Sequence, residues 1–145
     1  MSVTVTGGFL SITVPSASAD MGSFQNEVAG ESASASIGVV QVDDARSAGA
    51  GAGWVATVIS TAFTPAAGPT IAASALSYSA GLVSKVGTAT YVDNDPSDLT
   101  GVSAAVTASG ITGDNSATWS PTITIAIPGG MAAGIYTASI THSVA

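Results

Sequence analysis

The sequence predicts an all-β protein, an antiparallel β-sandwich of the immunoglobulin-like or Greek-key style, folded as a single domain over residues 1–145. Short stretches in which apolar and polar residues alternate recur along the chain, as expected for strands with one buried face. Clusters of Gly, Pro, Asn, Asp and Ser separate these stretches at short, regular spacing. A domain of this length buries roughly 70% of its unfolded surface, so it can form its own core.

Three strands are predicted in the first half of the chain. Phe9–Val14 ends before a proline, which cannot donate to a β-ladder. The segment from Ser34 to Val42 alternates and ends at a pair of aspartates. Gly53–Ile59 follows a flexible Gly-Ala-Gly-Ala connection. The side chains expected on one face of this third strand are Trp54, Ala56 and Val58.

Five further strands are predicted in the second half. They cover Ala75–Ser79, Lys85–Val92, Val102–Ala108, Ala117–Ile127 and Ile135–Val144. The clearest period-two pattern is the row of Ile123, Ile125 and Ile127, which predicts a buried face. Turns rich in Asp and Asn are predicted at Asp93–Asp98 and Gly113–Ser116, since these side chains can bond their own backbone.

Composition excludes several classes of partner. The net charge is −7, with only Arg46 and Lys85 as basic side chains, so the surface cannot neutralise the phosphates of a nucleic acid. The chain has no cysteine and therefore no disulfide framework. It also has no run of about 18 apolar residues, so membrane insertion is not expected.

The composition also bears on location. A surface built from Ser, Thr and Gly is common in extracellular proteins. The first residues lack the basic and apolar regions of a signal peptide. Two interpretations are open, a cytosolic chain or a secreted one whose signal peptide is absent here. Composition favours the second, with the cell surface or cell wall as the location.

No catalytic residue is predicted, and the chain is not expected to be an enzyme. His142 is the only histidine, and its neighbour Ser143 points to the opposite face of a strand, so the two cannot act as a pair. No Gly-x-Ser-x-Gly elbow is present. A hydrolase is therefore the last-ranked class, and no cofactor is predicted.

Four aromatic residues are the candidates for contact with a ligand. They are Trp119, Tyr91, Tyr78 and Trp54. Each has an alternative role in ordinary strand packing, and Trp54 in mid-strand favours the core. Trp119 precedes Ser120-Pro121, where the proline disrupts pairing and can expose the ring.

No metal site is predicted with any strength. The best oxygen cluster for a calcium ion is Asp93, Asp95 and Asp98, with a solvated turn as the default interpretation. Asp43, Asp44 and Arg46 are expected to shape a turn with a surface ion pair.

Two separated regions resemble the signature segments of the WxL domain family of Gram-positive cell-surface proteins. The first is Val42-Asp-Asp-Ala-Arg46 leading into Gly53-Trp54. The second is Gly134-Ile-Tyr136 followed by Ile140-Thr-His-Ser-Val144. The resemblance covers about residues 9–144.

The chain departs from the family pattern within both motifs. Ala56 stands at the Leu position of the first Trp-x-Leu, and His142 and Val144 replace the Trp and Leu of the second. The chain is therefore similar to a divergent WxL-like domain. Membership implies a secreted β-sandwich that associates non-covalently with the wall, often through peptidoglycan, and that joins other surface proteins in assemblies.

Two functions follow as expectations. The first is a non-catalytic surface domain that binds cell-wall polysaccharide or peptidoglycan. The second is a structural subunit that forms a homo-oligomer or filament, joins other surface proteins, or builds a virion. An apolar, charge-poor surface with few lysines to guard its sheet edges is prone to such association.

Overall fold

The computed structural model describes residues 1–25 and 28–145, and these residues form an all-β structure. The strands are β1 (Leu10–Thr13), β2 (Glu31–Ser36), β3 (Val40–Asp44), β4 (Ala52–Ser60), β5 (Leu76–Ser79), β6 (Ser84–Asp93), β7 (Ser103–Trp119), β8 (Thr122–Ile127) and β9 (Ile140–Val144). One short 3-10 helix, η1 (Ala73–Ala75), precedes β5. No helix among the described residues has the length and hydropathy needed to cross a bilayer.

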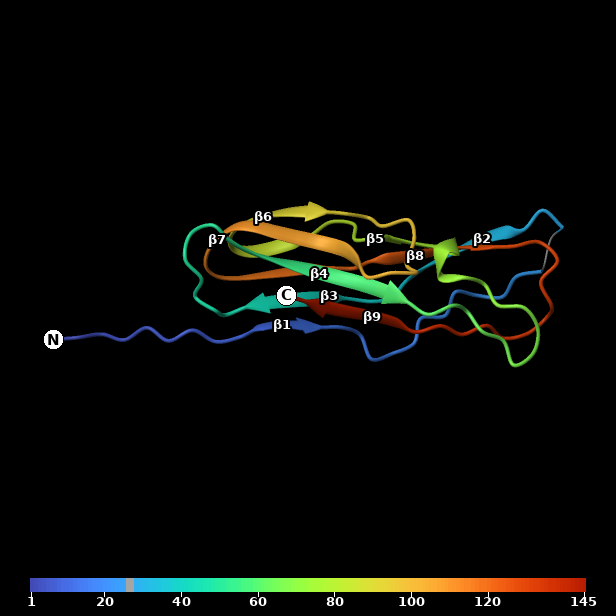
Figure 1. The fold of residues 1–145 in the computed structure, drawn as a ribbon, viewed down its shortest axis with the longest axis horizontal. Helices are drawn as coiled ribbons and strands as arrows, with labels where there is room; N and C mark the ends of the chain where they lie inside the picture. The colour runs from blue at the N-terminus through green and yellow to red at the C-terminus, as the bar shows by residue number, and fades with distance from the viewer. Residues whose placement is uncertain (26–27) are drawn as a thin grey trace.

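The strands form two antiparallel sheets (Figure 1). The larger has the order β1-β3-β7-β4-β9, and β6 pairs with β7 outside this path. Its two end strands, β1 and β9, come close to each other, so the five strands nearly close into a barrel. The smaller sheet has the order β2-β8-β5. The prediction of an all-β antiparallel domain is confirmed.

The long strand β7 turns back on itself. Its first half pairs with β4 and its last residues pair with β3, both antiparallel. Because β3 and β4 run in opposite directions in Figure 1, β7 must reverse between them. Gly110 and Gly113, both at positive φ, lie in this stretch, and β6 follows the bend with Gly87 at φ +91°. Glycine is the residue that takes such angles without strain.

The β2–β8 pairing of the small sheet continues, along the chain, the β3–β7 pairing of the large sheet. Ser36 lies opposite Thr122 in β2 and β8, and Val40 lies opposite Trp119 in β3 and β7. The gap between these two ladders is bridged by the Ile37 N–H, which donates to the Pro121 carbonyl at 3.2 Å. Pro121, which has no N–H, therefore stands where one sheet passes into the other.

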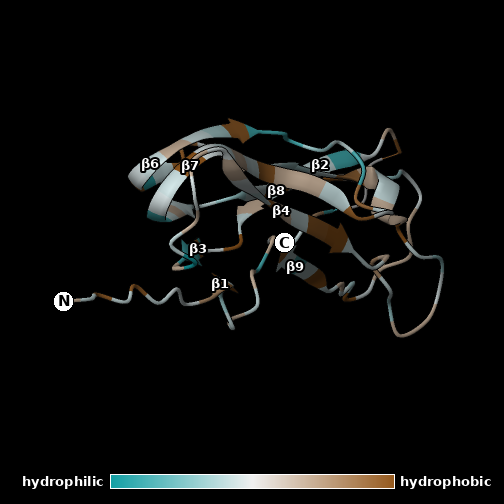
Figure 2. Ribbon diagram, turned by 60° about the vertical axis from the view of Figure 1, so that its left-hand side comes forward, coloured by the Kyte–Doolittle hydropathy of each residue, from teal (hydrophilic) through white to brown (hydrophobic). Residues whose placement is uncertain are grey.

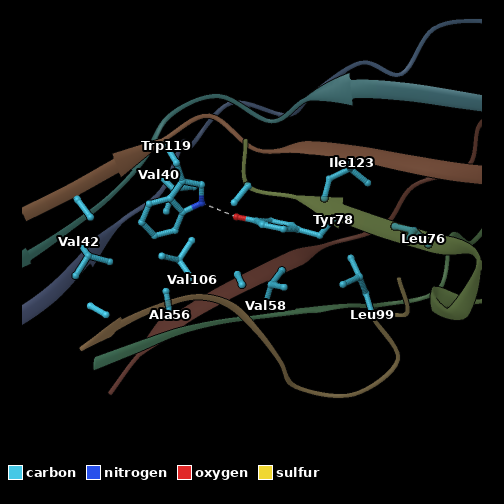
Figure 3. Close-up of a cluster of buried hydrophobic side chains, with 14 of the residues drawn as sticks. Val40, Val42, Ala56, Val58, Leu76, Tyr78, Leu99, Val106, Trp119 and Ile123 are labelled. Atoms are coloured by element: carbon cyan, nitrogen blue, oxygen red, sulfur yellow. Dashed lines mark hydrogen bonds between the residues drawn. The ribbon is translucent and has the colours of Figure 1, made fainter. Parts of the chain in front are cut away.

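One hydrophobic core lies between two layers of strands, with β5, β8 and the end of β7 in one layer and β4 in the other (Figure 3). Figure 3 shows Tyr78, Trp119 and Ile123 from β5, β7 and β8 facing Ala56 and Val58 of β4. All five are nearly inaccessible to solvent. The predicted rows Trp54–Ala56–Val58 and Ile123–Ile125 are confirmed as buried, and Ile127 at the end of its row is half-buried.

The structure corrects three predicted boundaries. The segment Ser34–Val42 is two strands, because Gly38 takes a φ of +94° between β2 and β3. Most of Ile135–Val144 is irregular, and only β9 is a strand. The predicted turn at Gly113–Ser116 lies inside β7, because Ser116 pairs with both β3 and β6, Asn115 pairs with β3, and these ladders outweigh the local turn preference.

We expect Gly87→Ala to destabilise the fold. A Cβ at this position would lie 2.6 Å from the Asp114 carbonyl oxygen, and the φ of +91° is strained for alanine. The expected loss in the free energy of unfolding is about 1–3 kcal/mol, measured by urea denaturation. Gly101→Ala is the control, because no atom lies within 4 Å of its added Cβ. Equal stability of the two variants would contradict the role of Gly87 in the bend.

Candidate functional site

The bend of β7 encloses a group of polar side chains that we call the corner network. Its members are Asp44, Arg46, Trp54, Tyr91 and Asn115. The Arg46 guanidinium donates from Nε to Asp44 Oδ1 at 2.8 Å and from Nη2 to Oδ2 at 2.9 Å. Asn115 Nδ2 donates to the same carboxylate at 3.1 Å, and the Trp54 indole N–H donates to Asn115 Oδ1 at 3.1 Å. The network thus joins β3, β4 and β7.

Asp44 is the buried charge of the corner network. Its side chain is inaccessible to solvent, whereas that of Arg46 is 35% exposed. The hydrogen bond from Arg46 lowers the pKa of Asp44 from 3.8 to about 2, against the effect of burial. The prediction of a surface ion pair is therefore wrong. A carboxylate removed from water depends on its hydrogen-bond partners, so loss of either member of the pair would destabilise the corner.

Two of the candidate ligand-binding residues belong to this corner. Trp54 is buried, which confirms the interpretation of a core residue and leaves its ring without access to a ligand. Tyr91 is half-buried against Trp54, with ring centroids 5.7 Å apart. The Lys85 ammonium lies 5.8 Å from the Tyr91 ring centroid. Tyr91 is thus the only one of the four aromatic candidates whose ring stays partly accessible in the described structure.

The other two candidates lie in the core at the opposite end of β3. Trp119 donates from its indole N–H to the Tyr78 hydroxyl oxygen at 2.7 Å, as Figure 3 shows. Both residues are buried. The expectation that Pro121 exposes the Trp119 ring is wrong, because Val40 pairs with Trp119 and the ladder continues past the proline. Neither ring can stack on a sugar in this arrangement.

His142 completes a chain of three polar groups in this part of the core. Its Nε2 lies 3.1 Å from the Tyr78 hydroxyl. Because an indole only donates, the Tyr78 oxygen accepts from Trp119, and its own hydrogen is satisfied by donation to Nε2. Burial lowers the pKa of His142 and raises that of Tyr78, so both stay neutral. This assigns the imidazole proton to Nδ1.

A groove of about 400 Å³ opens next to His142. Its walls come from the segment after β1, from β2 and β8, and from the stretch that leads into β9. Its lining includes Ser18, Met21, Phe63, Tyr136, Thr137 and His142. Tyr136 is half-buried, and its hydroxyl donates to the Ala132 carbonyl at 2.8 Å.

The three candidate calcium ligands lie at the end of β6 and in the loop that follows it. Asp95 Oδ1 accepts from the Ala80 N–H and Asp98 Oδ1 accepts from the Thr100 N–H, both at 2.8 Å. Asp93 is the exposed last residue of β6. Across the described residues, no group of three or more His, Cys, Asp or Glu side chains is placed to hold a metal ion.

The geometry around His142 does not assemble a catalytic triad from the described residues. The side-chain partner of its ring is Tyr78, a neutral phenol whose pKa is raised by burial. Ser143 faces the other way, and its hydroxyl lies 2.7 Å from that of Thr57 on β4. No carboxylate in the described structure is hydrogen-bonded to His142, so the imidazole lacks the orienting acid that nucleophilic catalysis requires.

Sequence reasoning missed Asn115 and the groove. Asn115 lies in a stretch that reads as a turn, and only the pairing of β7 with β3 makes it a buried core residue. The groove gathers Ser18, Phe63 and Tyr136 from three distant parts of the chain. No local pattern could show that these residues meet.

We expect Asp44→Asn to lower stability at neutral pH. The pKa of Asp44 falls from 3.8 to about 2 on folding, so its ionised form contributes stability above pH 3.8 that is lost as the pH falls toward 2. The corresponding free energy is roughly 2 kcal/mol. Urea denaturation at several pH values measures it, and the variant should lose less stability in acid.

Asp43→Asn is the matched control for that experiment. The Asp43 carboxylate accepts two bonds from the Gln41 amide, both at 2.9 Å, within the same strand. A small effect is therefore expected. If the two variants were equally stable at pH 7, Asp44 would not hold the corner.

The pKa of His142 predicts a second pH effect in a different window. Its folded pKa lies below 6.5 because of burial, so the unfolded chain takes up the proton first as the pH falls. The stability that this group contributes is complete above pH 6.5 and is lost below it. Thermal melting at pH 7.5 and pH 5 should show a larger drop for the wild type than for His142→Gln. An identical drop in both proteins would contradict the assignment of a buried neutral imidazole.

No protein-family model, curated protein or solved structure matches this chain. The interpretation of the site therefore rests on its own geometry and on the motifs quoted above.

Proposed function

We propose that this chain is a non-catalytic domain of a secreted cell-surface protein, and that it associates non-covalently with the cell wall or a wall glycan. The groove beside His142 is the observation that carries the proposal. It combines the half-buried rings of Phe63 and Tyr136 with polar groups from Ser18, Thr137 and His142. A sugar presents an apolar C–H face and a rim of hydroxyls, and such a mixed lining suits both.

The aromatic contacts of this proposal differ from those expected from sequence. Trp54, Trp119 and Tyr78 are buried. The aromatic residues proposed to contact the ligand are therefore Tyr136 and Phe63, which line the groove. Tyr91 lies at the far corner of the molecule and is a separate, weaker candidate. Since the groove is neutral apart from the proton equilibrium of His142, it suits an uncharged sugar better than a phosphate-rich polymer.

The motifs that resemble the WxL domain support the same proposal. Asp44 and Arg46 of the first motif and Trp54 all belong to the corner network, and the carbonyl of Gly53 accepts from Arg46 Nη2 at 3.1 Å. Residues that a family shares for the sake of its fold would be expected to meet in this way. The proposal includes the finer fold assignment, an immunoglobulin-like or Greek-key sandwich, supported by a core held between two layers of strands that β7 links.

A second candidate function is a structural subunit of a surface filament, a virion or another assembly. The observation that favours it is the exposure of large apolar side chains outside the core. They include Val3, Val5, Phe9, Leu82, Val86, Val92 and Ile135. Few charges separate these side chains, so association with a second chain would remove them from water.

Co-sedimentation with purified Gram-positive cell walls tests the first proposal. We expect saturable pelleting of the wild-type protein, and up to about tenfold weaker binding for Tyr136→Ala because a stacked aromatic ring contributes about 1 kcal/mol. Leu82→Ala is the matched control, since it removes an exposed apolar side chain outside the groove. Absence of pelleting, or equal pelleting of Tyr136→Ala and wild type, would refute wall binding through this groove.

A further inference from the structure

The first eight residues form an arm that runs away from the body of the protein. Figures 1 and 2 both show it as an extended trace beyond β1. Val3 and Val5 are 90% and 80% exposed, and they alternate with Thr4 and Thr6. This is the pattern of a strand, and no backbone hydrogen bond joins residues 1–6 to any other described residue.

The base of the arm is fixed on the fold. The Gly8 N–H donates to the Ala45 carbonyl, and the Ala45 N–H donates to the Phe9 carbonyl at 2.9 Å. Gly7 packs so closely that an added Cβ would lie 2.5 Å from the Arg46 carbonyl oxygen. The arm therefore leaves the body at a defined point, directly beside the corner network.

The body also offers a strand edge without a partner. β6 pairs with β7 alone, and beyond its bend at Gly87 the other edge of Thr88–Asp93 lies beside no described strand. Val86, Thr88, Thr90 and Val92 on this strand are all exposed. A long edge of this kind presents free N–H and C=O groups to any chain that can pair with them.

Length, side chains and charge of the arm suit this edge. Five or six extended residues span about 17–20 Å, which is the usual length of a strand. Both segments present Val and Thr, and pairs of such side chains across strands are favourable. The arm carries no charged side chain, and β6 carries one charge of each sign, Lys85 and Asp93, so this contact lacks the repulsion expected between copies of net charge −7.

We propose that residues 2–6 of one copy pair as an added strand with the free edge of β6 in a second copy. The inference rests on the second candidate function and is independent of wall binding. Each copy has one arm and one free edge at different places, so the contact is head-to-tail and joins successive copies into a ring or an open chain of subunits. Backbone hydrogen bonds supply the contact, and burial of Val3 and Val5 adds to it.

Site-specific cross-linking tests the pairing directly, because the chain has no cysteine of its own. Val3→Cys protein is mixed with Thr90→Cys protein under mild oxidation, and the mixed disulfide dimer is quantified on a non-reducing gel. The matched control replaces Thr90→Cys with Thr122→Cys. Thr122 is also an exposed strand residue, but it lies on β8, which is paired on both edges. We expect the mixed dimer with Thr90→Cys and its loss with Thr122→Cys.

Light scattering after size-exclusion chromatography gives the assembly state of the same proteins. We expect concentration-dependent oligomers of the wild type, and their loss on deletion of residues 2–6 or in Thr90→Lys, while Thr122→Lys retains them. Oligomers that survive the deletion would overturn the arm contact and leave assembly standing. A monomer at every concentration would overturn both. A disulfide within one chain of the Val3→Cys/Thr90→Cys double variant would also overturn the proposal, since the arm would then cover its own edge.

Discussion

The buried carboxylate of Asp44 is the interaction on which the rest of this structure depends. It accepts three bonds from Arg46, two from the guanidinium and one from the backbone N–H, and one from Asn115, which in turn accepts from Trp54. A charge removed from water is stable only while such partners stay in place. Because these partners come from β3, β4 and β7, the carboxylate fixes how β7 folds back on itself. That bend places β3 and β4, which pair with the two halves of β7, on opposite sides of the core.

The two ends of the molecule have different characters as a result. At one end of β1, Leu10 lies opposite Asp44, and the corner network fills the space with mutually satisfied polar groups. Beyond the other end of β1, Val14 and Pro15 line the groove next to His142. At this end a hydrogen-bonded chain of neutral groups, Trp119, Tyr78 and His142, closes the core. The strands do not close around the groove outside it. The charged corner and the neutral groove therefore lie beyond opposite ends of β1, and the proposed recognition site is separate from the buried ion pair.

This separation accounts for how the motifs relate to the proposed function. The Asp, Arg and Trp that carry the resemblance to the WxL domain make contacts within one network inside the protein. Sugar recognition at the wall would depend on groove residues such as Phe63 and Tyr136, which lie outside the first motif. Association between copies would use a third region, the arm and the edge of β6. Tyr91 of β6 belongs to the corner network, whereas the groove shares no residue with the other two regions, so the groove can be altered separately from them.

The sequence by itself determined the fold class, most strand positions and the burial of the alternating rows, since a period of two specifies which side chains face a core. It also correctly placed Trp54 inside the protein. Local patterns failed at three places because of pairing with distant strands. This pairing overrides the turn preference of Gly113–Ser116 and buries the charge of Asp44. It also keeps the Trp119 ring buried despite the nearby Pro121. The groove and the corner network were decided by tertiary structure alone. The corner network meets where β7 folds back, and the groove gathers distant segments of the chain, so contacts between positions so far apart leave no periodic signal in the sequence.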